Sequence, residues 1–372
     1  MVDNSNHDYT IFDTIIDGNG IFAVYRIPGS TVINFMAQES GEPTCFSEIN
    51  SIFGTEGFVV SPFSTEKGRS IVIFRNDVIL EGIDNIFNYL NNCNQLCEKS
   101  ARHVNEYESV RESDDFSRYE QAFKTMHSSL LNGMCDKVVL SRKVNIFKPI
   151  GFSTGNSFYS ALNAYPDAFV CLFSSPLTGT WLVISPEMIL SGNGDEWQTV
   201  SLAGTKFRSE DLTEISWDAK NMGEQEIVSD YIEHQLIFRN LNYIKKGPYT
   251  AAAGKILHLK TDYFFRLNDN LNPAEMLELL HPTPAVCGFP RENALKLIQN
   301  SEGYDRSFYS GFCGPYMTQG NTCLYVNLRC MEITTESLDL YSGGGLMPSS
   351  QLKNEWEETE AKLQTMLSVI NH

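Results

Sequence analysis

Short apolar runs separated by hairpin-length turns set the strongest limit on how this chain can fold. Three runs in the first 110 residues, GIFAVYRI, GFVVSPF and SIVIFRN, alternate with glycine, asparagine and proline turns. Further strands are predicted at 137–147, 168–175, 179–186, 187–194, around 322–333 and at 337–341. Because short turns join antiparallel neighbours, the sequence predicts large, mostly antiparallel sheets.

Helical spacing appears in separate stretches between these strands. The stretch 115–133 is amphipathic, and further helices are predicted at 218–243, 291–298 and 350–370. Strands in hairpins with separated helices predict the α+β class, specifically a layered α/β sandwich with large mostly antiparallel sheets flanked by helices.

The 372 residues can bury one large core or two ordinary ones. The sequence has no low-complexity linker and no internal repeat. We therefore expect a single catalytic unit over 1–372, in which an N-terminal part, 1–115, is joined to a segment, 116–372, that carries the distinctive motifs.

Charge and composition exclude several classes of partner. The net charge of −18 argues against nucleic acid, and it requires local cations or a metal if the substrate is an anion. No apolar run is long enough to cross a bilayer, and the polar N-terminus is unlike a secretory signal. Nine scattered cysteines, of which Cys93 and Cys97 are the closest pair, favour reduced thiols and a cytoplasmic location.

Common cofactor motifs do not occur in the chain. It has no HExxH, no phosphate-binding P-loop and no GxGxxG after a strand, so zinc-hydrolase, NTPase and Rossmann interpretations lose their usual support.

The C-terminal segment EWEETEAKL is unusually rich in carboxylates and follows SGGGLMPSS at 342–350, which we interpret as a glycine-rich turn. Glu355, Glu358 and Lys362 stand at i, i+3 and i+7 beside the apolar face of the predicted helix. Taken alone, such a run is more often a solvated helix face, and the Glu358–Lys362 pair would stabilise the helix by about 0.2–0.5 kcal/mol.

Three further ionisable residues border apolar segments. Lys137 begins the strand VVL. It is either an exposed strand end or a partly buried amine that could act as a base. Glu187 follows the apolar strand TWLVIS. It is either a turn residue or a desolvated general acid. Glu224 leads the buried stripe of its helix, and together with Glu358 it could hold Mg²⁺ from two sides.

Two polar, glycine- and proline-punctuated stretches, 201–208 and 281–294, are predicted as loops of fixed backbone. Gly204 in the first could present backbone N–H groups to an anion. Arg329 lies among apolar neighbours of a predicted strand, where it needs a carboxylate or a ligand.

Taken together, these stretches resemble the chorismate-utilising enzymes, which include isochorismate, salicylate, anthranilate and aminodeoxychorismate synthases. The matching segments run in order over about 235 residues, nearly two thirds of the chain. They are DKVVLSR, SPEMIL, LAGTKFR, KNMGEQEIV, HPTPAVCGFP, YSGFCG, NLRC and SGGGL with EWEETEAKL. The first 120 residues match nothing so distinctive.

The resemblance implies a role for each matching position. It implies that Glu224 and Glu358 hold Mg²⁺ on the ring carboxylate of chorismate, and that Glu355 reaches the metal through water. The positions that it implies for substrate contact are Gly204, Thr205, His258, His281, Tyr309, Arg329, Gly343 and Lys362. Gln225 is a departure, since relatives often have His after the metal glutamate.

Two positions separate the activities within the family. Lys137 resembles the base of the water-using members, whereas ammonia-using anthranilate synthases typically carry a non-basic residue there. Ala203 stands where aminodeoxychorismate synthases carry a nucleophilic lysine. The resemblance therefore implies an isomerase that converts chorismate to isochorismate: neutral Lys137 activates water for attack at C2, and protonated Glu187 donates to the departing C4 hydroxyl.

Alternatives remain at this stage. Salicylate synthase, which also eliminates pyruvate, is the nearest, followed by anthranilate synthase component I and by a non-catalytic relative. We expect no amidotransferase subunit and a monomer. The product could serve menaquinone or siderophore biosynthesis, and we favour menaquinone.

Overall fold

The computed structural model describes residues 7–66, 68–92, 112–207, 216–253, 256–268 and 270–370. Over this part of the chain, the strands form two nine-stranded sheets in which every pairing of named strands is antiparallel. The strands of the first sheet, in spatial order, are β14 (Gly288–Phe289), β7 (Lys137–Phe147), β18 (Ser337–Leu346), β17 (Cys330–Ile333), β9 (Gly179–Ser185), β8 (Phe169–Ser175), β1 (Ile21–Arg26), β2 (Asn34–Gln38) and β6 (Val78–Glu81). Those of the second are β12 (Tyr243–Ala253), β13 (Ile256–Arg266), β11 (Glu196–Phe207), β10 (Met188–Asn193), β16 (Asn321–Val326), β15 (Phe312–Tyr316), β4 (Gly57–Ser61), β5 (Ile71–Phe74) and β3 (Thr44–Phe46).

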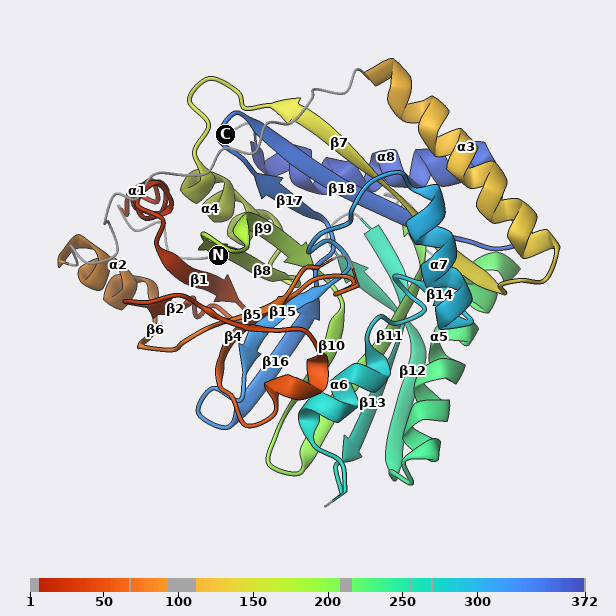
Figure 1. Cartoon of the computed structure of the whole chain (residues 1–372), viewed down its shortest axis with the longest axis horizontal. Coiled ribbons are helices and arrows are strands. Elements are labelled where there is room, and N and C mark those ends of the chain that lie inside the picture. The colour runs from red at the N-terminus through yellow and green to blue at the C-terminus, as the bar shows by residue number, and fades with distance from the viewer. Residues whose placement is uncertain are drawn as a thin grey trace.

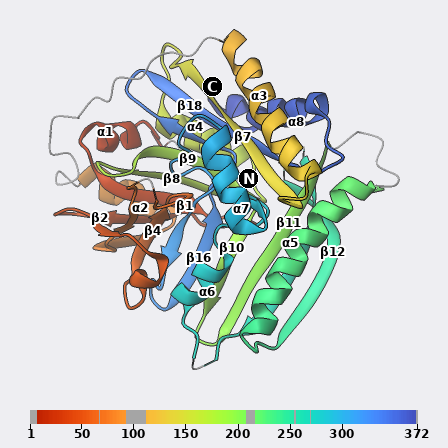
Figure 2. The same ribbon diagram turned by 45° about the vertical axis from the view of Figure 1, so that its right-hand side comes forward.

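Helices cover the outer faces of the two sheets (Figure 1). The described helices are α1 (Ile11–Asp17), α2 (Ile83–Asn92), α3 (Glu112–Leu131), α4 (Thr154–Ala164), α5 (Ala219–Phe238), α6 (Pro273–Leu280), α7 (Arg291–Ser301) and α8 (Leu352–Ile370), with a 3₁₀ turn η1 (Ile49–Ile52). Helices α1, α2, α4 and α8 share a core with the first sheet, whereas α5 and α6 lie on the second (Figure 2). A third core, with Phe58, Trp181 and Tyr325 among its members, fills the space between the sheets. The layered α/β sandwich predicted from the sequence is confirmed.

The N-terminal strands are built into both sheets. Strand β1 pairs with β8 in the first sheet, and β4 pairs with β15 in the second. Residues before 92 therefore share the sheets of the later segment. Among the described helices, none is long and apolar enough to cross a membrane.

The glycine-rich segment after residue 341 differs from its prediction. Instead of a turn at 342–350, Ser342–Leu346 continue strand β18 and pair with Arg142–Val138 of β7. Glycine composition suggested a turn, but tertiary packing decides the conformation here, because side chains from other elements approach this strand too closely for a Cβ.

The stretch 201–208 also differs from its prediction as a loop. Residues up to Phe207 belong to β11, which pairs with β13 and has an irregular register between Ala203 and Lys206. Gly204 lies in this irregularity with φ +71°, so a bulge explains its glycine.

The helix predicted at 218–243 ends at Phe238, and Tyr243 begins β12. The predicted strand at 322–333 is two strands, because Arg329, at φ +45°, interrupts it. Cys93 and Cys97 lie outside the described residues.

Candidate active site

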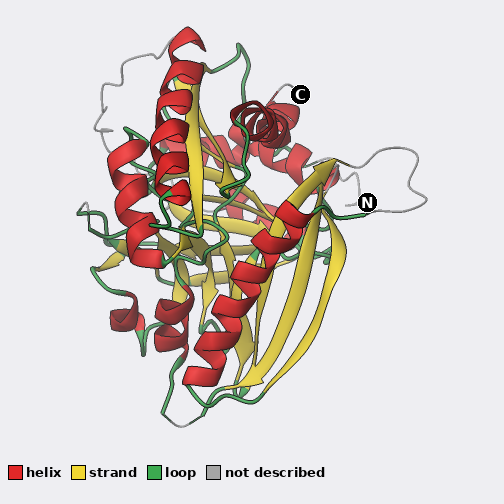
Figure 3. Cartoon of the chain, turned by 90° about the vertical axis from the view of Figure 1, so that its right-hand side faces the viewer, coloured by secondary structure: helices red, strands yellow, loops and turns green. Residues whose placement is uncertain are grey.

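A cavity opens between the β7–β18 edge of the first sheet and β11–β13 of the second. It contains about 640 Å³ of empty space when its open mouth is included. Helix α5 contributes Glu224 to the lining, and helix α8 contributes Lys362. Figure 3 shows the strands in yellow with the helices in red packed along them. The cavity brings together most of the residues predicted from the sequence: Glu187, Gly204, Thr205, Glu224, His258, Tyr309, Arg329, Gly343 and Lys362.

Lys137 lies directly behind the cavity wall. Its side chain is fully buried, and its Nζ lies 3.0 Å from Glu224 Oε1 without making a hydrogen bond of normal geometry. The interpretation of Lys137 as an exposed strand end is therefore wrong. A Cβ at Gly345 would come within 2.0 Å of Glu224 Oε1 and 2.8 Å of Lys137 Cε, so this ion pair requires a glycine on β18.

Glu187 sits in the cavity wall just after β9 and is only 2% exposed. Burial raises its pKa to about 8, although Lys137 and a weak hydrogen bond from Thr283 act in the opposite direction. The carboxyl group therefore carries a proton at neutral pH. This is the protonation state that a general acid needs.

Two further carboxylates come from the first two turns of α8. Glu355 is buried, and its Oε1 accepts a hydrogen bond from Lys220 at 2.5 Å, whereas its Oε2 has no partner among the described residues. Glu358 accepts a hydrogen bond from Lys362 at 2.7 Å. Burial tends to raise the pKa of Glu358, but Lys362 and Lys220 outweigh it and lower that pKa overall.

Three glutamates thus converge on the backbone of one glycine pair. A Cβ at Gly344 would lie 3.5 Å from both Glu355 Oε2 and Glu358 Oε1, and Glu224 meets the neighbouring Gly345. Each glutamate has its own lysine: Lys137 with Glu224, Lys220 with Glu355 and Lys362 with Glu358.

The described residues contain no group of three acidic, histidine or cysteine side chains already close enough to hold a metal ion. The donor chemistry of the three glutamates nevertheless suits Mg²⁺, which prefers carboxylate oxygens and water. The unpartnered Glu355 Oε2 is a buried acceptor that still lacks a cation or donor within the described part of the chain. Glu224, Glu355 and Glu358 are therefore the residues that would hold Mg²⁺.

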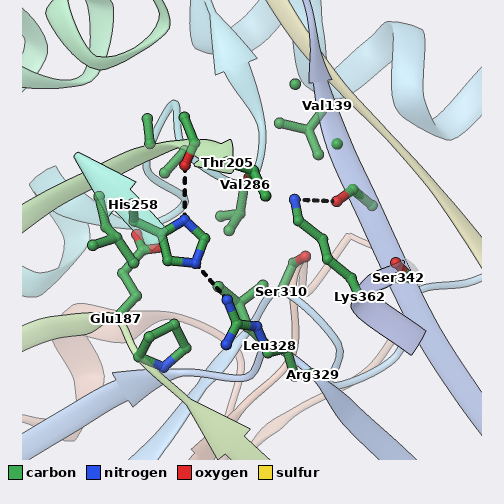
Figure 4. A pocket seen from close by; sticks show the side chains of 18 of the residues that line it. Val139, Glu187, Thr205, His258, Val286, Ser310, Leu328, Arg329, Ser342 and Lys362 are labelled. Atoms are coloured by element: carbon green, nitrogen blue, oxygen red, sulfur yellow. Dashed lines mark hydrogen bonds between the residues drawn. The ribbon is translucent and has the colours of Figure 1, made fainter. Parts of the chain in front are cut away.

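A second polar chain fixes the opposite wall (Figure 4). Arg329 donates to Nε2 of His258, whose Nδ1 lies 2.7 Å from the carbonyl oxygen of Gly204. These partners assign the proton of the neutral imidazole to Nδ1. Burial, Arg329 and Lys362 hold the pKa of His258 well below its usual range, and burial lowers that of Arg329 to about 10. At neutral pH His258 is therefore neutral, and Arg329 stays charged.

Two of the remaining predicted substrate contacts, Gly343 and Thr205, already make hydrogen bonds within the protein. Gly343 supports the wall, because a Cβ there would lie 2.8 Å from the Tyr309 hydroxyl, and its carbonyl accepts from Lys362 at 2.9 Å. The Thr205 N–H already donates to Asn221 Oδ1 at 3.0 Å.

His281 does not line the cavity. Its Nε2 faces the Phe63 carbonyl at 3.2 Å, and burial lowers its pKa to about 4. We therefore leave it out of the proposed substrate contacts.

Gln225, the departure from the family pattern, faces away from the cavity. Its amide donates to Ser201 Oγ at 2.7 Å and to Thr261 Oγ at 3.1 Å. It thus joins α5 to β11 and β13.

Sequence reasoning missed several polar residues of the site, among them Lys220 and Ser310. Lys220 precedes Glu224 by four residues in KNMGEQEIV, so helical spacing could have placed it on the same face. Ser310 follows Tyr309 in YSGFCG, where nothing in the pattern separates it from an ordinary turn serine.

Comparison with known proteins identifies the family of the chain. Residues 46–371 match the model of a family described as chorismate binding enzyme. The chain belongs to this chorismate-binding family. The family resemblance inferred from the motifs is confirmed.

Curated relatives include two isochorismate synthases. EntC of Escherichia coli (strain K12) is 30% identical over 244 residues, which cover 63% of this chain and 62% of EntC, so the match spans less than two thirds of that relative. DhbC of Bacillus subtilis (strain 168) is 30% identical over 286 residues, 73% of this chain and 71% of DhbC. The solved structure of MenF, the menaquinone-specific isochorismate synthase from Escherichia coli, has a TM-score of 0.77 at 18% identity and covers 99% of this chain and 92% of MenF. That structure supports the fold.

Proposed function

We propose that this chain is an isochorismate synthase, which adds water at C2 of chorismate and removes the C4 hydroxyl. The observation that carries the proposal is Glu187, a carboxyl group in the cavity wall whose pKa is raised to about 8. A protonated carboxyl can donate to a leaving hydroxyl, and such a proton transfer accelerates a reaction roughly 10²–10⁴-fold.

Charge in the site favours an anionic substrate accompanied by a divalent cation. Three glutamates are matched by three lysines, and Arg329 adds one further positive charge. Chorismate carries two carboxylates, and Mg²⁺ would bring two compensating positive charges. The pair can therefore enter together without changing the balance, despite the net charge of −18.

The proton transfers can be assigned to this chain's residues. Lys137 in its neutral form takes a proton from water as the water oxygen bonds to C2. Both double bonds of the ring shift, the C4–oxygen bond breaks, and Glu187 gives its proton to the departing hydroxyl, which leaves as water. Because one water enters and one leaves, the reaction is an isomerisation.

Lys137 must be released from Glu224 to act in this way, because in the structure it lies behind that carboxylate. Glu224, Glu355 and Glu358 would hold Mg²⁺, which when bound neutralises the ring carboxylate and stabilises developing charge. Arg329, fixed by His258, and Lys362 would bind and orient the carboxylates of the substrate.

Product analysis tests the proposal. Purified protein is incubated with chorismate and Mg²⁺, without ammonia and with an EDTA control, and the products are separated by chromatography. Isochorismate that disappears with EDTA supports the proposal. Salicylate with pyruvate would assign the chain to salicylate synthase instead, and unconsumed chorismate would refute both.

Variants test the two assigned roles. Lys137→Ala and Glu187→Ala should each nearly abolish turnover while leaving Mg²⁺-dependent binding of chorismate. Lys143→Ala is the matched control, because this lysine lies on the same strand but pairs with Asp339 at 2.9 Å and does not line the cavity. Substantial turnover by either active-site variant would refute its role.

A further inference from the structure

Two residues of the cavity wall have a backbone conformation that side chains seldom adopt. Ser310 has φ +61° and Arg329 has φ +45°. A positive φ is unfavourable for a residue that carries a Cβ, and such strain gathers at ligand sites where the surroundings enforce it. Arg329 already has a binding role in the proposed function, but Ser310 has none.

The turn that carries Ser310 is fixed on both sides. The Ser310 N–H donates to the Asn327 carbonyl at 2.9 Å, and the Asn327 side chain donates to the Phe308 carbonyl at 3.0 Å. The next residue, Gly311, packs so closely on β4 that a Cβ would lie 2.0 Å from the Ser61 carbonyl oxygen. The backbone of Ser310, and with it the Cβ that carries the hydroxyl, is therefore fixed before any ligand arrives.

That hydroxyl has no partner within the described residues. Ser310 is fully buried by its neighbours, yet its Oγ makes no hydrogen bond with any of them. The Tyr309 hydroxyl lies close enough for Ser310 to oppose the rise that burial gives the pKa of Tyr309, but the geometry between the two hydroxyls falls short of a normal hydrogen bond. Buried polar groups normally have partners, so an orphan hydroxyl in a cavity wall indicates a donor that is completed by a ligand.

The surroundings identify the chemical class of that ligand. Figure 4 shows Ser310 between Arg329 and Lys362, at the side of the cavity where the two cations lie. Asn327, which fixes the Ser310 turn, is two residues from Arg329. An oxyanion bound by Arg329 would therefore lie within the region that the Ser310 hydroxyl faces.

We propose that Ser310 is a substrate-binding residue, whose hydroxyl donates a hydrogen bond to the substrate carboxylate that Arg329 binds. This proposal rests on the proposed function, because it takes chorismate as the anion. Arg329 supplies the charge, and Ser310 supplies a neutral, preorganised donor that fixes the direction of the carboxylate.

Two substitutions separate the hydroxyl from the backbone strain. Ser310→Ala removes the hydroxyl and keeps a Cβ at positive φ, whereas Ser310→Gly removes the hydroxyl and relieves the strain. Ser307→Ala is the matched control, because Ser307 is a buried serine at φ +54° that does not line the cavity. All three are made in a Glu187→Gln background, so that chorismate binding is measured calorimetrically with Mg²⁺ and without turnover.

Both Ser310 variants should weaken chorismate binding roughly tenfold to a hundredfold, the range for a hydrogen bond to a charged group, while Ser307→Ala leaves it unchanged. In the enzyme that keeps Glu187, the two Ser310 variants should raise KM more than they lower kcat. The double variant Arg329→Lys/Ser310→Ala should weaken chorismate binding by less than the product of the two single fold-changes, because both residues bind one carboxylate.

Equal binding by the parent and both Ser310 variants would overturn this proposal alone. Weaker binding by Ser310→Ala but not by Ser310→Gly would also overturn it, because the effect would then come from the backbone. If the parent protein binds no chorismate, the proposed function fails together with the Ser310 assignment.

Discussion

Replacement of Glu187 by glutamine should change how the stability of the protein depends on pH. The unfolded carboxyl titrates near 4.5, and burial raises the folded pKa to about 8. Between these values the folded state holds a proton that the unfolded state has lost. The contribution of Glu187 to stability is therefore fully present below pH 4.5, and it is lost as pH rises toward 8.

The size of the effect follows from the shift. One pKa unit corresponds to about 1.4 kcal/mol, so a rise from about pH 5.5 to about pH 7.5 should lower the stability of the wild type by about 3 kcal/mol through this group alone. The amide of the Glu187→Gln variant cannot titrate, and it has nearly the same shape as the carboxyl group. The difference in unfolding free energy between wild type and variant should therefore move by that amount in favour of the variant.

Urea unfolding of both proteins at about pH 5.5, 6.5 and 7.5, with EDTA present, measures this difference. Glu357→Gln, at an exposed position on α8, controls for the loss of one negative charge. A difference between the wild type and Glu187→Gln that stays constant over the three pH values would refute the buried, protonated state of Glu187. The assignment of this residue as the general acid would then lose its physical basis.

Three other outcomes follow from the carboxylate cluster. Lys220→Met should lower the unfolding free energy by about 3 kcal/mol in EDTA, because it leaves buried Glu355 unpaired. Mg²⁺ should restore part of this loss. An unchanged unfolding curve in EDTA would contradict the pairing of Lys220 with Glu355. Gly345→Ala should abolish turnover while the protein stays folded, because the new Cβ would lie 2.0 Å from Glu224 Oε1. Normal kinetics with an unchanged circular dichroism spectrum would contradict this close approach of Glu224 to β18. Mg²⁺ should raise the melting temperature of the wild type but hardly that of Glu224→Gln, and an equal rise would place the cation elsewhere.

The sequence was sufficient for the fold class and for most of the cavity wall. A short continuous apolar run predicted β7 at its observed bounds, because a strand that is buried on both faces has such a run. The apolar strand before Glu187 left two possibilities, a turn residue and a desolvated general acid. The burial of the carboxyl group agrees with the second.

The errors arise where tertiary contacts override local preference. Glycines at 343–345 have turn-like composition, but they lie in β18 because the Tyr309 hydroxyl and the Glu224 carboxylate occupy the space of a side chain. Lys137 could not be placed from its neighbours in sequence, since its burial depends on α5 and β18. Ser310 was missed because an unpartnered hydroxyl becomes visible only when all surrounding atoms are in place.

Isotope labelling tests the central claim most directly. The enzyme is incubated with chorismate and Mg²⁺ in ¹⁸O-enriched water, and the isolated product is analysed by mass spectrometry. Attack by solvent water at C2 predicts isochorismate that carries one solvent oxygen, and no such product with Glu187→Ala. Isochorismate without the label would contradict water addition, and a product formed only when ammonia is supplied would contradict the proposed activity itself.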